Sequence, residues 1–278
     1  MPSAVFRPTT TFSATNSQAI EAGFMPARRS AVITAVKELS EGIIRLTFAD
    51  AYIAEHAQPA QFVNLYLPDP LHTAPRPFGV SEVNGEEVSL IFAVVGVGTE
   101  RFAQLQPGDT VDVLGPLGRP FNLEQSGHYV LVGGGLGVPP LIKAAQDLSR
   151  RADVQCTAVF GYRDDHFADE YVKRYADFAF SIDESEGNVI TLLDRIEARH
   201  AGQRSAQPKI LVCGPLGMMK AVAAWTSRRN LSCQLSMEQR MGCGYGTCVV
   251  CTVDTKYGRK KVCSDGPVFN AQDMGWNE

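Results

Sequence analysis

Residues 130–140 read Val130-Leu-Val-Gly133-Gly134-Gly135-Leu-Gly137-Val-Pro-Pro140, and this stretch decides the fold. It ends an apolar run typical of a buried strand and opens an amphipathic segment at 139–150, so it joins a strand to a helix. Glycines at such a junction permit a tight turn and let a pyrophosphate approach the helix N-terminus. The spacing is not a strict GxGxxG, so a tight turn without a ligand remains an alternative. The candidate nucleotide-binding glycines are Gly133, Gly134, Gly135 and Gly137.

Strands and helices alternate on the C-terminal side of this turn. Such alternation predicts βαβ units and a parallel sheet, so we expect a doubly wound α/β nucleotide-binding domain over residues 125–230. The expected strands are 128–132, 154–160, 178–181 and 210–212, and the expected helices are 139–150, 168–175, 189–199 and 216–227.

A second strand-to-helix turn carries Cys213, Gly214 and Pro215. Open α/β sheets bind ligands at the carboxyl edge of their strands, so these three residues are also nucleotide-binding candidates. Taken singly, Cys213 is more often a packed residue than a functional one. The turn after the strand at 154–160 contains Arg163 followed by two aspartates. The aspartates would repel a 2′-phosphate and the arginine would attract one, and the balance favours NAD over NADP.

The residues N-terminal to the glycine-rich stretch show a different pattern, in which short runs rich in β-forming residues are separated by turn signals such as Asn84-Gly85. Five or six such strands with little helical pattern predict a small antiparallel barrel, which we place at residues 27–124. Only residues 100–105 suggest a short helix. The expected strands are 31–36, 43–48, 61–67, 88–95 and 110–114.

Two segments of the predicted barrel carry groups suited to a flavin nucleotide. In Arg76-Pro77-Phe78-Gly79 the guanidinium can pair with a pyrophosphate and the aromatic ring can pack on a flavin. A surface arginine in a turn is the alternative. In Gly96-Val-Gly98-Thr99 a short helix begins, and it offers backbone amides and a hydroxyl to a phosphate.

Four of the seven cysteines lie within 21 residues near the C-terminus, at Cys243, Cys248, Cys251 and Cys263. The spacing C-x4-C-x2-C with a later fourth cysteine is that of plant-type 2Fe–2S sites. Three thiolates converge on the cluster from one loop, and the interleaved glycines let the backbone curl closely around it. Zinc sites prefer paired C-x2-C units, of which only one is present here. Zinc, and free or disulfide-bonded cysteines, remain the alternatives.

Residues 231–278, which contain these four cysteines, show little apolar periodicity. Such a segment cannot build a core alone, so a bound metal centre would supply the missing cohesion, and we expect a small 2Fe–2S cluster domain. Cys156 and Cys233 fit packed positions, where a thiol behaves as a small apolar group. An odd number of cysteines without a signal peptide argues against a secreted disulfide framework.

Length and composition are those of a globular protein, because 278 residues with 20% charged residues suffice for two domains with their own cores. A net charge of −4 leaves no basic excess, which argues against nucleic acid as the main partner. No apolar run approaches the ~18 residues of a membrane helix, so we expect no membrane segment and a cytoplasmic location. Residues 1–26 lack the apolar stretch of a signal peptide, and we expect a flexible tail or, alternatively, a docking segment.

These motifs, in this order, resemble the ferredoxin–NADP reductase superfamily and, within it, the electron-transfer subunits of two-component, NAD-dependent dihydroorotate dehydrogenases. The resemblance covers about residues 30–275, and its most specific part is the cysteine segment continued through 261–269. It implies FAD, a 2Fe–2S cluster and NAD(H) as electron donor or acceptor. It also implies a partner, an FMN-containing catalytic subunit that oxidises dihydroorotate to orotate in pyrimidine biosynthesis, within a heterotetramer of two plus two chains.

By resemblance, the FAD would be held by two neighbouring strands and the turn that follows them, through Arg76, Pro77, Phe78, Gly79, Ile91, Phe92, Ala93, Gly98 and Thr99. Two positions depart from the family pattern. Gly79 stands where the family usually has a serine or threonine hydroxyl, unless Ser81 substitutes, and Ala93 stands where it often has an arginine.

The implied electron path leads from the nicotinamide through FAD to the cluster. The nicotinamide exchanges electrons in pairs and the cluster exchanges them singly, and only the flavin can do both. No nucleophile–base motif suggests other chemistry, so we expect no catalytic acid or base in this chain. Three rival readings stay open: the same module serving an NADH-dependent ferredoxin:NADP oxidoreductase or a sulfhydrogenase, a redox sensor, and a zinc-stabilised structural protein. Co-purification with a partner would test the first of these, and absence of NADH-driven bleaching of a bound flavin would favour the redox sensor. A colourless protein would indicate the zinc-stabilised one.

Overall fold

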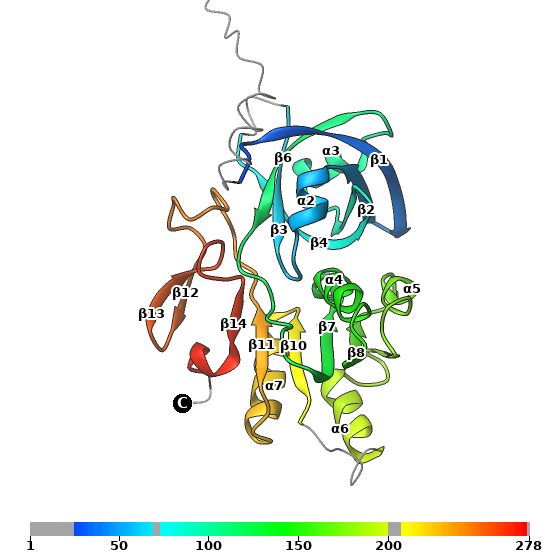
Figure 1. The fold of residues 1–278 in the computed structure, drawn as a ribbon, viewed down its shortest axis with the longest axis vertical. Coiled ribbons are helices and arrows are strands. Elements are labelled where there is room, and N and C mark those ends of the chain that lie inside the picture. Colours follow the sequence, from blue (N-terminus) through cyan, green and yellow to red (C-terminus); the bar gives the residue numbers. More distant parts are fainter. Residues whose placement is uncertain (1–24, 69–72, 200–206, 277–278) are drawn as a thin grey trace, which may run out of the picture.

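The structure is a computed structural model that describes residues 25–68, 73–199 and 207–276 (Figure 1). The predicted tail over residues 1–26 lies outside the described residues except for its last two positions. Figure 1 shows a barrel stacked above an α/β layer, with the C-terminal segment along one side of both.

The first part of the chain forms the expected six-stranded antiparallel barrel, closed in the order β1-β2-β5-β4-β3-β6. Its strands are β1 (Arg29–Ser40), β2 (Ile43–Ala49), β3 (Phe62–Tyr66), β4 (Arg76–Asn84), β5 (Glu87–Ala93) and β6 (Thr110–Leu117). Two short helices accompany them, α2 (Ala51–His56) and α3 (Val97–Ala103). Of these, β4 and α2 are absent from the sequence-based expectation.

Strand β3 shows how the barrel separates its two faces. Val63 and Leu65 are fully buried in the barrel core. Phe62, Asn64 and Tyr66 alternate with them and therefore point to the outer face. That outer face is turned toward the rest of the molecule, since Phe62 packs into the hydrophobic cluster of the α/β part.

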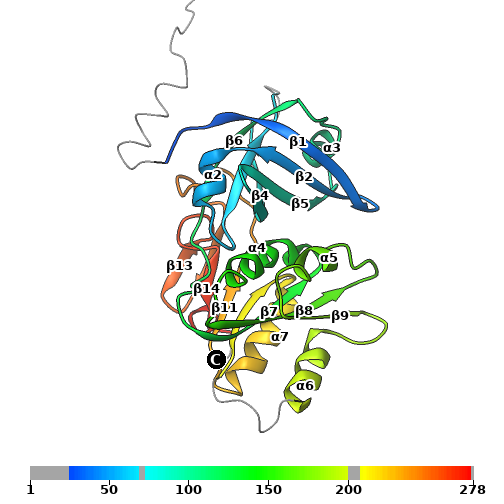
Figure 2. The same cartoon turned by 45° about the vertical axis from the view of Figure 1, so that its right-hand side comes forward.

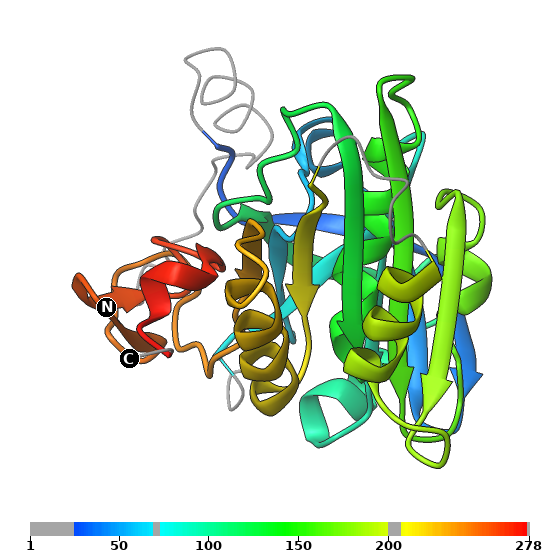
Figure 3. The same cartoon turned by 90° about the horizontal axis from the view of Figure 1, so that it is seen from below.

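The second part is a six-stranded sheet in the order β14-β11-β10-β7-β8-β9, in which all pairs except β11–β14 are parallel. Helices α4 and α5 lie on the face toward the barrel and α6 and α7 on the opposite face, which confirms the doubly wound arrangement (Figures 2 and 3). The strands are β7 (Gly127–Gly134), β8 (Val154–Tyr162), β9 (Phe178–Asp183), β10 (Lys209–Cys213), β11 (Cys233–Ser236) and β14 (Val268–Asn270). The helices are η1 (Gly135–Gly137), α4 (Val138–Leu148), α5 (Asp169–Val172), α6 (Val189–Arg199) and α7 (Leu216–Ser227).

The strand order contains a topological switch point between β7 and β10. From β7 the chain proceeds outward to β8 and β9, then crosses back and proceeds through β10 to β11 on the other side. Ligands of open α/β sheets bind outside the carboxyl ends of the strands at such a point. Both turns that the sequence singles out, after β7 and after β10, begin there.

The C-terminal segment is not a separate body. Its strands β11 and β14 belong to the α/β sheet, and only the hairpin β12 (Thr252–Thr255) and β13 (Gly258–Lys261) forms a sheet of its own, followed by η2 (Ala271–Met274). Figure 3 shows this segment beside the β11 edge. The boundary predicted at residue 231 therefore falls just before a strand of the shared sheet.

A buried polar network fixes the barrel against the α/β part. Glu82 on β4 is 1% exposed and accepts hydrogen bonds from Arg45 Nη2 at 2.8 Å and from the Tyr175 hydroxyl at 2.5 Å. Beside it, the Gln146 side chain on α4 both donates to and accepts from the backbone of Val83. Because these groups satisfy one another away from water, they specify one orientation of the two parts. No helix in the described ranges is long and apolar enough to cross a membrane.

Candidate functional site

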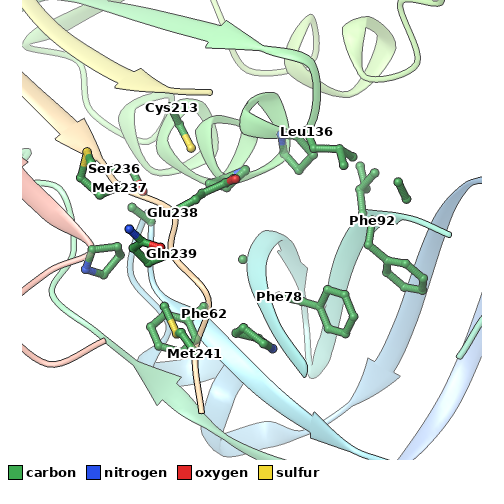
Figure 4. A pocket seen from close by; sticks show the side chains of 18 of the residues that line it. Phe62, Phe78, Phe92, Leu136, Cys213, Ser236, Met237, Glu238, Gln239 and Met241 are labelled. Carbon is green, nitrogen blue, oxygen red and sulfur yellow. The ribbon is translucent and has the colours of Figure 1, made fainter. Parts of the chain in front are cut away.

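A cleft of about 300 Å³ lies where the barrel, the carboxyl edge of the sheet and the C-terminal segment meet (Figure 4). Its walls are mainly apolar, with a few polar groups at one side, as in many cofactor sites. The barrel contributes Ala60, Phe62, Pro77, Phe78, Gly79, Ile91, Phe92, Ala93, Val95 and Thr99. The sheet edge contributes Leu136, Pro139, Pro140 and Cys213, and the C-terminal segment contributes Ser236, Met237, Glu238, Gln239, Met241 and Pro267.

The barrel wall brings together the residues that the resemblance assigns to FAD. Seven of those nine line the cleft, and the other two, Arg76 and Gly98, lie against each other. A Cβ atom on Gly98 would lie 2.7 Å from Arg76 Nε, so the guanidinium lies directly against this glycine. The Phe78 ring packs on Phe92 with centroids 4.7 Å apart. An arginine beside a glycine turn and a flat apolar wall fit the pyrophosphate and the ring system of FAD.

Gly79 is explained by its neighbour across the domain interface. A Cβ atom there would lie 2.9 Å from Pro140 Cγ at the start of α4, so a serine or threonine would collide with that ring. Ser81 does not replace the missing hydroxyl, because it is buried and donates to the Ser89 carbonyl at 2.7 Å inside the barrel. In this chain, close packing of Pro140 occupies the place where the resemblance leads us to expect a hydroxyl.

The Thr99 hydroxyl shapes the turn before α3. It donates to the Gly96 carbonyl at 2.9 Å and accepts from the Val95 amide at 2.8 Å. The sequence suggests that this hydroxyl contacts a phosphate directly, whereas here its hydrogen-bonding capacity serves the backbone. Its contribution to a bound phosphate is therefore to hold the turn that presents the amides.

The two turns at the switch point touch each other through glycines. A Cβ atom on Gly137 would lie 2.3 Å from the Cys213 carbonyl oxygen, and one on Gly134 would lie 2.6 Å from Met218 Sδ. Gly133 packs deeper, under Val138, whereas Gly135 has φ +51° and open space around its Cα. The turns thus form one surface on which backbone amides are accessible to a pyrophosphate.

Gly137→Ala is predicted to disturb this surface more than its small size suggests. The added methyl meets backbone atoms, so the two turns must separate, at a cost of about 1–3 kcal/mol. We expect NADH affinity to fall about tenfold or more and the melting temperature to fall by a few degrees, with FAD retained. Gly217→Ala is the matched control, because nothing lies within 4 Å of a Cβ built there. Isothermal titration with NADH and a thermal melt test both; unchanged NADH affinity in Gly137→Ala would contradict the assignment.

Cys213 and Glu238 line the cleft on the side opposite the barrel, at the ends of the adjacent strands β10 and β11 (Figure 4). Burial, and then the neighbouring Glu238 carboxylate, raise the pKa of the Cys213 thiol, so it stays neutral and apolar. Partial enclosure by the walls raises the pKa of Glu238, although the residue keeps exposed surface at the rim. Sequence reasoning missed Glu238, whose only signal is its place two residues after β11, a strand that the sequence did not reveal.

The four C-terminal cysteines lie as two pairs. Cys251 and Cys263 have their sulfurs 3.3 Å apart, and the Cys248 amide donates to Cys243 Sγ at 3.4 Å. The Gly246 amide donates to Cys263 Sγ at 3.1 Å. Across the described ranges, no group of three or more Cys, His, Asp or Glu side chains lies close enough together to hold a single metal ion. Two pairs with amides aimed at sulfur fit a cluster of two irons.

Backbone amides of the loop favour the thiolate form of Cys243. Burial alone would raise the pKa of Cys243, but the amides of Cys248, Tyr245 and Thr247 outweigh it and lower that pKa to about 6. Cys263 differs from Cys243, because burial and then the neighbouring Cys251 thiol raise its pKa to about 12. Burial raises the pKa of Cys156 in β8 to about 12 as well, so the spacing and the amide contacts, rather than the pKa values, distinguish the four cluster cysteines.

A barrel whose arginine–proline–aromatic strand faces the switch point of a doubly wound sheet defines a flavin- and nicotinamide-dependent reductase of the ferredoxin–NADP reductase type. Residues 131–224 match the oxidoreductase NAD-binding domain, and residues 238–275 match the iron–sulfur cluster binding domain of dihydroorotate dehydrogenase B. The chain belongs to the family of electron transfer subunits of NAD+-dependent dihydroorotate dehydrogenase B.

Two relatives show the extent of the likeness. The dihydroorotate dehydrogenase B electron transfer subunit of Bacillus caldolyticus is 36% identical over 267 residues, covering 90% of this chain and 99% of the relative. That of Clostridium perfringens is 32% identical over 246 residues, covering 85% and 94%.

Solved structures agree on the fold. An NADH-dependent reduced ferredoxin–NADP oxidoreductase structure, described for flavin-based electron bifurcation, is similar with a TM-score of 0.78 and 25% identity, over 91% of this chain and 92% of that one. A mutant ferredoxin–NADP+ reductase of Plasmodium falciparum has a TM-score of 0.58 at 9% identity, over 75% and 96% of the two chains, and shows the fold alone.

Proposed function

We propose that this chain carries electrons between NAD(H) and an FMN-containing dihydroorotate dehydrogenase catalytic subunit, through FAD and a 2Fe–2S cluster. The observation that carries this proposal is the single cleft lined by the barrel, the nucleotide turns and the segment that leads into the cluster loop. Electron transfer needs the three cofactors to be close, and the fold brings their three candidate sites to one place.

The residues of this chain bind and orient, and none acts on a substrate. When bound, FAD supplies the conversion between hydride transfer and single-electron transfer. Arg76 and the turn at Gly98 hold its pyrophosphate, and the wall of Pro77 and Phe78 supports its ring system. The turns at Gly137 and Gly214 position the nicotinamide nucleotide at the opposite wall.

The catalytic subunit docks beside the cluster loop in this proposal. The loop exposes Tyr245, Val249 and Val250, with Val249 71% exposed, next to the cluster cysteines. Exposed apolar side chains grouped on one loop are typical of interaction sites. The assembly is a heterotetramer of two such chains and two catalytic chains. A cytoplasmic location accords with the three cysteines outside the cluster loop, Cys156, Cys213 and Cys233, which are free thiols of the kind that reducing compartments maintain.

Reduction of the isolated chain tests the cofactor assignment. Anaerobic NADH should bleach the flavin absorption first and the iron–sulfur absorption afterwards. A colourless preparation, or flavin that NADH does not reduce, would contradict the proposal. Reduction by NADH without any response of the assembled complex to dihydroorotate would instead favour a partner such as that of the ferredoxin–NADP oxidoreductase with similar structure.

Glu238→Gln is predicted to alter NAD+ binding and its pH dependence. The Glu238 pKa is raised above its usual range, so the carboxylate forms only as the pH rises through that higher value. A carboxylate at the cleft attracts the cationic nicotinamide ring, so NAD+ affinity should increase with pH in the wild type, by about threefold to tenfold. The neutral variant should show a flat profile. Fluorescence titration at several pH values measures this, with Glu55→Gln on exposed α2 as the control; a variant that keeps the wild-type profile would exclude Glu238.

A further inference from the structure

Asn64 lies between the flavin wall and the cluster loop. It is on the outer face of β3, between Phe62, which lines the cleft, and Tyr66. Its side chain is 0% exposed, although the barrel core lies on the other side of the strand. The atoms that bury it therefore come from outside the barrel.

Those atoms belong to the first cluster cysteine and its neighbour. Asn64 Nδ2 donates to the Cys243 carbonyl at 2.8 Å, across 179 residues of sequence. Gly244 has φ +80°, and a Cβ atom there would lie 2.5 Å from Asn64 Nδ2 and 2.6 Å from Oδ1. Only glycine allows the loop backbone to lie this close to the amide.

The same residue is fixed directly to the flavin wall. In the β3–β4 ladder Asn64 pairs with Pro77, and Phe62 pairs with Gly79. Cross-strand partners share a face, so Asn64 neighbours Pro77 and Gly79, two of the three β4 residues that line the cleft. A displacement of the cluster loop relative to Asn64 is thus a displacement relative to the flavin wall.

The hydrogen bonds of the Asn64 side chain contribute little to the stability of the folded chain. Its Oδ1 is buried without a hydrogen-bond partner in the described part of the chain. A buried unpaired acceptor costs stability, which an apolar side chain of similar size would avoid. The amide is therefore better explained by the position it gives to the Cys243–Gly244 peptide than by a contribution to the barrel.

We propose that Asn64 is a positioning residue that holds the Cys243–Gly244 peptide against the flavin wall and so sets the rate of single-electron transfer between FAD and the cluster. In each such step the reduced flavin loses one electron and the oxidised cluster gains it. This inference rests on the proposed function, since it presumes that both cofactors are bound.

Asn64→Leu removes the hydrogen bond and keeps a buried side chain of similar size. After anaerobic mixing of the holoprotein with NADH, we expect flavin reduction at the wild-type rate within about twofold, and cluster reduction slowed about tenfold or more. The cluster's electron paramagnetic resonance spectrum should broaden or shift, and a chelator should remove iron faster, because the loop is less constrained. Stopped-flow absorption separates the two rates.

Two further variants make the result decisive. Gln61→Leu is the matched control, because Gln61 precedes the same strand but donates to the barrel carbonyl of Gly118 at 2.7 Å. Asn64→Ser, which is too short to reach the Cys243 carbonyl, replaces the leucine variant if the latter does not fold. Wild-type cluster reduction and an unaltered resonance spectrum in a folded Asn64 variant would overturn the inference. Wild-type protein without a cluster, or without reduction by NADH, would instead overturn the proposed function.

Discussion

Cys251→Ala should abolish electron transfer between dihydroorotate and NAD+ in the assembled complex, by on the order of a thousandfold, because loss of one ligand removes the single-electron carrier. Cys251 is 1% exposed and its sulfur lies 3.3 Å from that of Cys263, which places the two thiols at one point of the cluster loop. Reduction of a small-molecule dye by NADH should persist within about threefold, since it needs only the flavin. Steady-state assays of both reactions on the same preparation give the ratio of the dihydroorotate-dependent rate to the dye-reduction rate.

Cys156→Ala is the matched control for that substitution. Cys156 is also almost completely buried, but it lies in β8, away from the loop, and its thiol is kept neutral by burial. The control should keep both activities and its iron. If Cys251→Ala retained a bound cluster and dihydroorotate-dependent NAD+ reduction, the assignment of the four ligands would be wrong.

Arg76→Ala should lower FAD affinity about tenfold to a hundredfold, because charge-assisted hydrogen bonds to a pyrophosphate contribute about 1.5–3 kcal/mol. The guanidinium lies over Gly98, where a Cβ atom would stand 2.7 Å from Arg76 Nε. The variant should lose flavin on gel filtration and regain it when FAD is added. Fluorescence titration of the flavin-depleted protein measures the affinity.

The control for Arg76→Ala is Arg259→Ala, at an exposed hairpin position where the arginine pairs with Asp254. It removes the same charge without touching the cleft. Retention of FAD with wild-type affinity in Arg76→Ala would place the pyrophosphate elsewhere on the barrel.

The fold was predictable from sequence where patterns are long. Helices α6 and α7 have the predicted bounds, 189–199 and 216–227. The apolar residues of α6 recur with helical period, whereas α7 is apolar along almost its whole length, and its twelve residues are too many for an ordinary strand. Strand β4 was hidden, because Pro77 and Gly79 read as turn signals although they lie in a strand. Helix α5 extends only over Asp169–Val172, shorter than the predicted 168–175.

Short elements account for the other differences. Strands β11 and β14 have four and three residues, too few for a period to show, yet they attach the C-terminal segment to the α/β sheet. As a result the sequence gives no hint that this segment lines the cleft. The predicted motifs on the barrel and at the sheet edge do meet there.

The residues that sequence reasoning missed act through long-range contacts. Asn64 touches the cluster loop across 179 residues, and neither residue carries a motif that predicts the other. Glu238 follows a strand that was not expected. Local patterns predict candidate groups for phosphate and metal, whereas groups that would position them depend on tertiary packing, which no local pattern encodes.

The most direct test of the central claim is an anaerobic visible spectrum of the complex with its catalytic subunit, recorded before and after addition of dihydroorotate and then of NAD+. We expect flavin and iron–sulfur absorption to bleach with dihydroorotate and to return with NAD+. Bleaching by NADH with no response to dihydroorotate would contradict the claim, because electrons would then reach this chain from the nicotinamide alone.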